Sequence, residues 1–277
     1  MKKIILVISS LISLNLFAIP FISQMMNEMQ NMVLGNQHPD YERESRIVSQ
    51  IEDSVLEGEV EKLSLPNGDK FFSIYQESET DKVKGGVIIL HNRGYHANWE
   101  YVVRPLRVDL AKKGWNTLSI QMPVLNKEAK YYDYLKIMPY ARPRIAVAIN
   151  FLRQQGLEKI IVIGHGCGVH MLMDYIEKYS DSEIDGFVGI GMGATDTGQK
   201  MPRPYPLAQM SVPVLDIYGE KDFAGVKRLA IIRKEALDRF GHIKSKQMVV
   251  KKADHYYKKP QAEKLLLNKI STWIDTI

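Results

Sequence analysis

Residues 159–170 read K-I-I-V-I-G-H-G-C-G-V-H, and this stretch decides the fold. A run of β-branched residues, Ile160 to Ile163, leads directly into glycines at positions 164, 166 and 168. A short apolar run of this kind is typical of a strand buried on both faces of a parallel sheet. Small residues two positions before and two positions after position 166 let a strand and the following helix approach closely. The stretch therefore predicts a buried strand, a sharp turn centred on Gly166, and a helix.

The rest of the chain alternates between strand and helix patterns. Pro66-Asn67-Gly68-Asp69 separates two strand-like runs, 60–65 and 71–76, and predicts a hairpin. The other predicted strands are 86–91, 117–121, 186–190, 212–218 and 246–250, and the predicted helices are 41–57, 101–113, 145–154, 169–179, 226–240 and 260–277. This order predicts an α/β fold, with a mostly parallel central sheet, helices on both faces and an antiparallel hairpin at one edge.

The size and composition are those of an ordinary globular protein. The chain has 277 residues, of which 45% are hydrophobic and 25% are charged, which is enough for one domain with its own core. Its formal net charge is +5, and no basic stripe with interleaved aromatic residues is present, so nucleic acid is not an expected partner. The mild positive charge fits solubility, with an anionic substrate or a membrane surface as the alternative.

The N-terminus has the features of a secretion signal. Lys2 and Lys3 precede an apolar run, 4–17, which is followed by Ala18. Because the run is shorter than the roughly 20 residues of a spanning helix, we expect cleavage near Ala18. The mature protein would then be periplasmic or secreted. An uncleaved N-terminal membrane anchor is the alternative.

We expect three parts along the chain. Residues 1–18 form a signal peptide, 19–58 an N-terminal tail with a surface helix, and 59–277 a single α/β domain. A methionine-rich segment, 25–33, lies in the tail. It fits either a loose terminus or a strip that adapts to a partner.

Polar residues that follow the later strands are candidates for acid–base chemistry, because ligands of such sheets bind beyond the carboxyl ends of the strands. Asp222 ends the pattern V-P-V-L-x-x-x-G-E-K-D, and it fits either the acid of a catalytic triad or the N-cap of a helix. His255 follows the last predicted strand. A carboxylate that orients one ring nitrogen leaves the other free as a base. We therefore predict an Asp222–His255 catalytic dyad.

The loop after the 86–91 strand is a second candidate. It contains His91, Asn92, Arg93 and Gly94. A loop at this position is expected to supply a backbone N–H to an oxyanion hole, and Arg93 could neutralise an anionic group of a ligand. In the alternative interpretation, His91 packs in the core and Arg93 faces solvent.

The turn centred on position 166 lacks a nucleophile. Gly166 has no side chain and cannot attack a substrate. Cys167 is a thiol candidate, but Gly164 and Gly168 are symmetric about position 166. In that register Cys167 offers its backbone N–H to the oxyanion while its side chain turns elsewhere. A water molecule activated by His255 is the remaining catalytic route.

Two further regions and two histidines surround the candidate site. Segments 123–140 and 193–211 are rich in Tyr, Met and Pro, and they fit a cap that binds a lipid, peptide or glycan, or simply packed loops. His165 and His170 are expected to pack or to form hydrogen bonds beside the turn. No spacing typical of metal ligands stands out, so we expect neither a metal nor a cofactor.

Over residues 60–277 the order of these signals resembles the α/β-hydrolase superfamily. The block N-W-E-Y-V-V-R-P-L-R-V-D-L-A-K-K-G-W-N-T-L-S-I-Q-M-P, residues 98–123, and the G-H-G-C-G turn are similar to an uncharacterised family of exported gamma-proteobacterial α/β-hydrolase-like proteins. Glycine at the apex of the turn, called the nucleophile elbow, is typical of that family. The resemblance implies the fold and a location in the cell envelope, and it implies no particular substrate.

Carried onto this sequence, the superfamily resemblance implies Asp222 as the acid, His255 as the base, and His91 to Gly94 with the Cys167 N–H as the oxyanion region. Three functions remain open. The first is an exported hydrolase of an ester or amide bond that uses the dyad without a serine. The second is a catalytically inactive hydrolase-fold binding protein of the cell envelope, and a thiol enzyme is a third option. The expected ligand is a small molecule, a lipid or a peptide.

Overall fold

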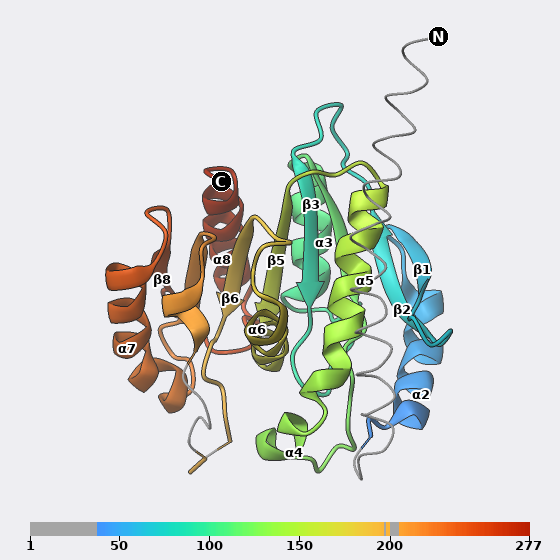
Figure 1. The fold of residues 1–277 in the computed structure, drawn as a ribbon, viewed down its shortest axis with the longest axis horizontal. Coiled ribbons are helices and arrows are strands. Elements are labelled where there is room, and N and C mark those ends of the chain that lie inside the picture. Colours follow the sequence, from blue (N-terminus) through green and yellow to red (C-terminus); the bar gives the residue numbers. More distant parts are fainter. Residues whose placement is uncertain (1–37, 197, 200–204) are drawn as a thin grey trace.

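A single mixed sheet forms the centre of the protein (Figure 1). The computed structural model describes residues 38–196, 198–199 and 205–277. Over these residues the strand order is β1-β2-β4-β3-β5-β6-β7-β8. The strand bounds are Glu59–Ser64 (β1), Lys70–Gln76 (β2), Gly85–Leu90 (β3), Trp115–Ile120 (β4), Ile160–His165 (β5), Gly186–Ile190 (β6), Val214–Gly219 (β7) and Lys246–Val250 (β8).

The pairing of the strands confirms the predicted fold class. β1 pairs antiparallel with β2, and β2 pairs antiparallel with β4. Every other neighbouring pair of strands in this sheet is parallel. The N-terminal hairpin therefore extends one edge of a parallel sheet, and the carboxyl ends of β3 to β8 meet along one border of it.

Helices cover both faces of the sheet (Figure 1). The α-helices are Tyr41–Ile51 (α2), Val103–Lys112 (α3), Tyr131–Leu135 (α4), Ala141–Gln154 (α5), Cys167–Tyr179 (α6), Ala224–Phe240 (α7) and Pro260–Ile274 (α8), and 3-10 turns span Glu52–Ser54, Met138–Tyr140 and Pro206–Gln209. Residues of α5 and α6 share one hydrophobic core with β3 to β5, and residues of α3 and α8 share the core on the opposite face.

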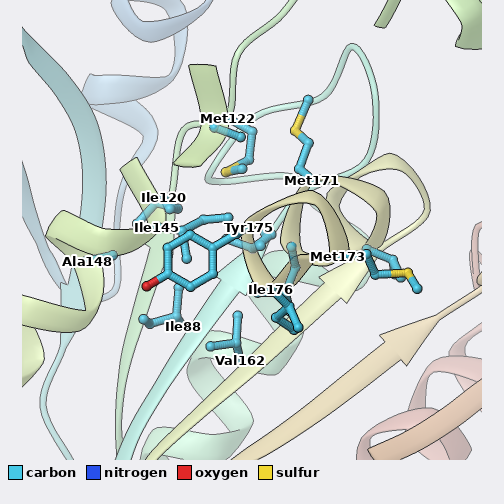
Figure 2. Packing of buried hydrophobic residues seen from close by; sticks show 14 of the residues in the cluster. Ile88, Ile120, Met122, Ile145, Ala148, Val162, Met171, Met173, Tyr175 and Ile176 are labelled. Atoms are coloured by element: carbon cyan, nitrogen blue, oxygen red, sulfur yellow. The ribbon is translucent and has the colours of Figure 1, made fainter. Parts of the chain in front are cut away.

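The continuous apolar run of β5 has partners on both sides. Val162 belongs to the core under α5 and α6, where it lies near Ile88 and Ile176 (Figure 2). Ile161 and Ile163 belong to the opposite core. Complete burial of one such side chain stabilises the fold by about 1.5–3 kcal/mol, so the run is strongly held in the middle of the sheet.

The helix predicted over 41–57 is shorter in the structure. α2 ends at Ile51, and a 3-10 turn follows. The Asp40 side chain caps the start of α2 by accepting a hydrogen bond from the Arg43 N–H at 2.9 Å. At the same end, buried Glu44 forms an ion pair with buried Arg144 of α5 at 2.7 Å. α2 is thus joined to the sheet domain by both apolar packing and charge.

Some predictions concern residues that the structure does not describe. The predicted signal peptide, 1–18, and the methionine-rich segment, 25–33, lie outside the described residues, as do residues 200–204 of the predicted cap. Within the described ranges, no helix has the length and apolar character needed to cross a lipid bilayer.

Candidate functional site

Four loops bring the candidate residues together at the carboxyl ends of the strands. Asn92 follows β3, Gly166 follows β5, Asp222 follows β7, and His255 lies in the loop after β8. These strands are neighbours or near neighbours in the parallel part of the sheet, so their ends face the same border. The site is therefore built from segments that are far apart in the sequence.

The turn between β5 and α6 has the sharp backbone of a nucleophile elbow. Gly166 has φ 52° and ψ −113°, a conformation that L side chains rarely adopt. A Cβ at Gly164 would lie 2.7 Å from the Val169 backbone N, and one at Gly168 would lie 2.6 Å from the His91 carbonyl oxygen. The flanking glycines are therefore required by close backbone contacts with α6 and with the loop after β3.

Asp222 and His255 form a buried hydrogen-bonded pair. His255 Nδ1 lies 2.9 Å from Asp222 Oδ1, and the two side chains are 1% and 0% exposed. Burial by itself would raise the pKa of Asp222. The hydrogen bond from His255, with those from the backbone N–H groups of Phe223 and Gly219, outweighs burial and holds the pKa of Asp222 below its usual value. Asp222 is thus a carboxylate that orients the His255 ring.

The side chain of Asn92 occupies the space between the elbow and His255. Its Oδ1 accepts hydrogen bonds from the backbone N–H of Cys167 at 2.8 Å and of Arg93 at 2.7 Å. Its Nδ2 lies 3.2 Å from His255 Nε2. A pair of N–H groups that converge on one oxygen is the arrangement of an oxyanion hole. In this protein the oxygen in that position belongs to the protein itself.

The hydrogen bonds of Asn92 determine the tautomer of His255. Since Asn92 Oδ1 accepts from two backbone N–H groups, the other end of the amide is the NH₂ group. That NH₂ group donates to His255 Nε2, so Nε2 carries no proton. The ring proton is therefore on Nδ1, which donates to Asp222. This is the tautomer in which a dyad histidine acts as a general base.

Asn92 and a side chain at position 166 compete for one volume. A Cβ placed on Gly166 would lie 2.3 Å from Asn92 Oδ1, 2.5 Å from Cγ and 2.8 Å from Nδ2. Real Cβ contacts are essentially never this short. The absence of a side chain at Gly166 is thus what gives the Asn92 amide its place.

Arg93 and Gly94 form hydrogen bonds with other segments of the protein. The Arg93 guanidinium forms two hydrogen bonds to Asp196, at 2.7 and 2.6 Å, and this bond lowers the pKa of Asp196. Asp196 also accepts from the backbone N–H of Tyr131 in α4. The Gly94 carbonyl oxygen accepts from Arg43 of α2. The Arg93 charge is therefore paired within the protein, and its contact with an anionic ligand stays a prediction.

Three buried histidines surround the elbow as neutral groups. Burial lowers the pKa of His91, His165 and His170 to about 3 each. His91 Nε2 accepts from the Met122 N–H at 2.8 Å, and His165 Nε2 donates to the His255 carbonyl oxygen at 2.9 Å. His170 Nδ1 lies 2.6 Å from the Tyr131 hydroxyl. These histidines hold the loops in place by hydrogen bonds.

Cys167 contributes its backbone and not its thiol. The residue is 2% exposed, and burial raises the pKa of its thiol to about 12. Almost no thiolate therefore exists at neutral pH, which argues against the thiol-enzyme interpretation. Its N–H points into the site, in the register that the elbow glycines predicted.

Sequence reasoning missed two features of the site. It placed Asn92 in the oxyanion loop but assigned the Asn92 side chain no role. It also missed Phe223, whose ring is 42% exposed and lies 4.6 Å from the His255 ring, centroid to centroid. The sequence did contain a signal for the role of Asn92. The loop after β3 carries a residue with a side-chain amide, Asn92, and the elbow apex is a residue without a side chain, Gly166.

Among the described residues, no group of three or more His, Cys, Asp or Glu side chains is placed to hold a metal ion. A cavity of about 740 Å³ lies away from the dyad, and its lining includes Tyr41 and Val48 of α2, Lys62 of β1, Phe72 of β2 and Arg144 of α5. None of the residues that line it belongs to the Asp222–His255 pair.

Known structures resemble this fold over most of the chain. An esterase from Pyrococcus furiosus has 16% identity and a TM-score of 0.61, with 82% of this chain and 93% of that chain covered. A dienelactone hydrolase from Anabaena variabilis has 16% identity and a TM-score of 0.58, with 79% and 97% covered. Est1E from Butyrivibrio proteoclasticus has 13% identity and a TM-score of 0.58, with 78% and 97% covered. At these identities the likeness shows the fold alone.

Sequence comparisons gave one family and no individual relative. No curated protein matches the chain. A family model described as "Protein of unknown function (DUF3530)" matches residues 5–136 and 140–276. The chain therefore belongs to the DUF3530 family, and its fold is that of the α/β-hydrolase superfamily.

Proposed function

We propose that this protein is an exported α/β-hydrolase-fold protein that works in the cell envelope as a binding protein and does not hydrolyse esters or amides. One observation carries the proposal: the Asn92 amide fills the place of a nucleophile and accepts the hydrogen bonds of both oxyanion donors. The structural neighbours are hydrolases, so the fold itself is one that supports ester chemistry. The difference lies in the centre.

Hydrolysis at this centre lacks both a nucleophile and a free oxyanion hole. Gly166 has no side chain, and the Cys167 thiol is buried and protonated. Removal of a single oxyanion donor typically slows an acyl-transfer enzyme by roughly 10²–10³-fold. Here the N–H groups of Cys167 and Arg93 are both occupied by Asn92. We therefore expect no turnover above background.

A second candidate is hydrolysis by a water molecule without a serine. The observation that favours it is the short Asp222–His255 contact of 2.9 Å, with the unprotonated Nε2 that a general base needs. This route requires the Asn92 side chain to leave, so that a water can take its place beside His255. The two candidates therefore differ in whether Asn92 is a fixed or a removable part of the site.

Aromatic rings beside the dyad support a binding role. Phe223 and Tyr256 pack around the His255 ring, with centroid distances of 4.6 and 5.3 Å. Tyr95 stacks on Trp99 at 3.8 Å and lies 6.4 Å from Tyr256. Half-exposed rings of this kind contribute large apolar contact areas to ligand binding. The surface fits the apolar part of a small molecule, lipid or peptide.

The export proposal rests on the sequence of the N-terminus. Lys2 and Lys3 followed by the apolar run 4–17 form a typical signal peptide with a cut near Ala18. Mass spectrometry of the N-terminal peptide from a periplasmic extract tests it. A peptide that begins near position 19 supports export with cleavage, and an intact N-terminus in the membrane fraction supports the anchored alternative.

Hydrolysis of p-nitrophenyl acetate, butyrate and octanoate by the mature protein tests the choice between the two candidates. The comparison uses the wild type, His255→Ala, and His242→Ala as a histidine control outside the site. We expect the same background rate in all three proteins. A wild-type rate that persists in His242→Ala and disappears in His255→Ala would establish the second candidate and overturn the first.

A further inference from the structure

The amide of Asn92 is bound in the way that a hydrolase binds the carbonyl of its substrate. Its oxygen accepts hydrogen bonds from the backbone N–H groups of Arg93 at 2.7 Å and Cys167 at 2.8 Å. Cys167 is the first residue of helix α6. Its nitrogen lies 3.2 Å from the free nitrogen of the dyad histidine, His255. In an acyl-transfer enzyme the substrate oxygen takes the first position, and the nucleophile takes the position beside the histidine. One side chain of this protein takes both.

The backbone around this amide is that of a complete elbow. Gly166 holds a left-handed conformation, φ 52°, and its N–H donates to the Ile190 carbonyl oxygen at 2.9 Å. Asp222 and His255 are in hydrogen-bond contact on the other side of the amide. The centre has no side chain at position 166, and the Asn92 amide occupies the space beside it.

These two differences depend on each other. With Asn92 in place, a Cβ at Gly166 would lie 2.3 Å from Oδ1. Without Asn92, the N–H groups of Cys167 and Arg93 would lose their protein acceptor. A buried N–H without an acceptor costs about 1–3 kcal/mol. The two positions therefore form one coupled unit.

We infer that Asn92 is a tethered occupant of an otherwise complete acyl-binding site. The inference rests on the proposed function, since it explains why the centre is silent. It goes beyond it by assigning the silence to Asn92 and Gly166 together. A serine at position 166 alone would not restore the site, because its side chain would have to displace the Asn92 amide from the N–H groups of Cys167 and Arg93.

Four proteins test this inference: the wild type, Asn92→Gly, Gly166→Ser and the double variant Asn92→Gly/Gly166→Ser. Each is incubated with a fluorophosphonate, which labels activated serines, and with p-nitrophenyl butyrate. We expect fluorophosphonate to label position 166 of the double variant at a rate about a hundredfold or more above that of Gly166→Ser. The reason is that only the double variant has both a nucleophile and free oxyanion donors. Addition of His255→Ala to the double variant should abolish the labelling.

Two outcomes would overturn the inference. Labelling of Gly166→Ser as fast as the double variant would mean that Asn92 is no obstacle. A folded double variant that is not labelled would mean that the site is not complete. Neither outcome depends on wild-type hydrolysis, so failure of this inference and failure of the proposed function are distinguishable.

A second measurement covers the case in which the double variant does not fold. Hydrogen exchange of the Cys167 amide is compared between the wild type and Asn92→Ala. Asn67→Ala is the control, since Asn67 is an exposed asparagine in the β1–β2 hairpin. We expect about tenfold faster exchange in Asn92→Ala, as befits the loss of one hydrogen bond, and no change in the control. Unchanged exchange in Asn92→Ala would show that Asn92 does not occupy the oxyanion donors.

Discussion

The site divides into two halves that differ in the chemistry of their side chains. The acid–base half consists of Asp222 and His255, in the loops after β7 and β8, whose side chains are joined by a hydrogen bond of 2.9 Å. The elbow half consists of Asn92, Gly166 and Cys167, after β3 and β5, and here the backbone keeps the hydrolase geometry while the side chains differ. The comparison teaches that strand ends fix where the loops meet, whereas single side chains decide whether chemistry is available.

The halves also differ in how they satisfy their polar groups. In the acid–base half a carboxylate and a ring share a hydrogen bond, and Asp222 receives further backbone N–H groups. In the elbow half the two oxyanion donors are satisfied by the neutral amide of Asn92. His255 belongs to both networks, through Nδ1 on one side and Nε2 on the other. Perturbations that act on one half should therefore be separable from those that act on the other.

Acid should have the largest effect on stability, and it should act through the buried histidines that surround the elbow half. The pKa of His91, His165 and His170 in the folded protein is about 3, because of burial, against 6.5 for an exposed histidine. Below pH 6.5 the unfolded chain therefore binds more protons than the folded one. The free energy of unfolding should fall by roughly 1.4 kcal/mol per pH unit for each of these histidines. Asp222, whose folded pKa is lowered, loses its contribution only as the pH falls below the usual carboxyl range.

Urea unfolding at pH 7, 6, 5 and 4.5 measures this slope. His170→Gln removes one of the three buried histidines, so its stability should depend less steeply on pH, by about one proton. Constant stability of the wild type between pH 6.5 and 4.5 would contradict the neutral, buried state of this histidine group.

The glycines that flank the elbow should show the next largest effect. In Gly168→Ala the new Cβ would meet backbone oxygens of His91 and Leu90 at 2.6 and 2.7 Å, which cannot move independently of the sheet. We expect a loss of about 3 kcal/mol of unfolding free energy. Gly186→Ala in β6 is the control, because its Cβ would meet only methyl tips of Ile161 and Ile277 at 2.9 Å. Thermal denaturation should rank Gly186→Ala well above Gly168→Ala, and equal losses would contradict the close backbone approach.

Loss of the Asp222 carboxylate from the acid–base half should lower the free energy of unfolding by a similar or smaller amount. Asp222→Ala leaves the His255 Nδ1–H and the Phe223 N–H buried without their acceptor, and we expect a cost of about 3 kcal/mol. Asp238→Ala removes an exposed partner of Lys234 and should change stability by less than about 1 kcal/mol. Chemical denaturation of both variants checks this. An Asp222→Ala variant as stable as Asp238→Ala would mean that the dyad does not stabilise the loops after β7 and β8.

The smallest expected signal is the alkylation of Cys167 in the folded protein. A thiol that is 2% exposed, with its pKa raised to about 12, should not react with iodoacetamide at pH 7.5 in the folded protein. Reaction should appear only in urea. Asn67→Cys, at the exposed hairpin, provides the positive control in the folded state. Rapid labelling of Cys167 in the native wild type would revive the thiol-enzyme interpretation.

Much of the fold was predictable because local sequence patterns carry it. The run Ile160 to Ile163 alternates between two cores, so it had to be a central strand. The helix of 41–57 was predicted too long, since α2 ends at Ile51 and a 3-10 turn continues the chain. The residue at which a helix ends depends on a few local hydrogen bonds, and a periodic apolar pattern does not indicate where these hydrogen bonds stop.

The sequence by itself determined the hairpin, the alternation of strands and helices, the elbow glycines, and the positions of Asp222 and His255 at strand ends. These follow from periodicity and from backbone sterics, which are properties of neighbouring residues. Only the tertiary structure decided that the Asn92 side chain lies over Gly166, and that Arg93 is paired with Asp196. Asn92 and Cys167 are 75 positions apart in the chain, and Gly166 directly precedes Cys167. Their shared volume exists only once β3 and β5 pair in the sheet, because a side chain can exclude another only where the fold brings them into contact.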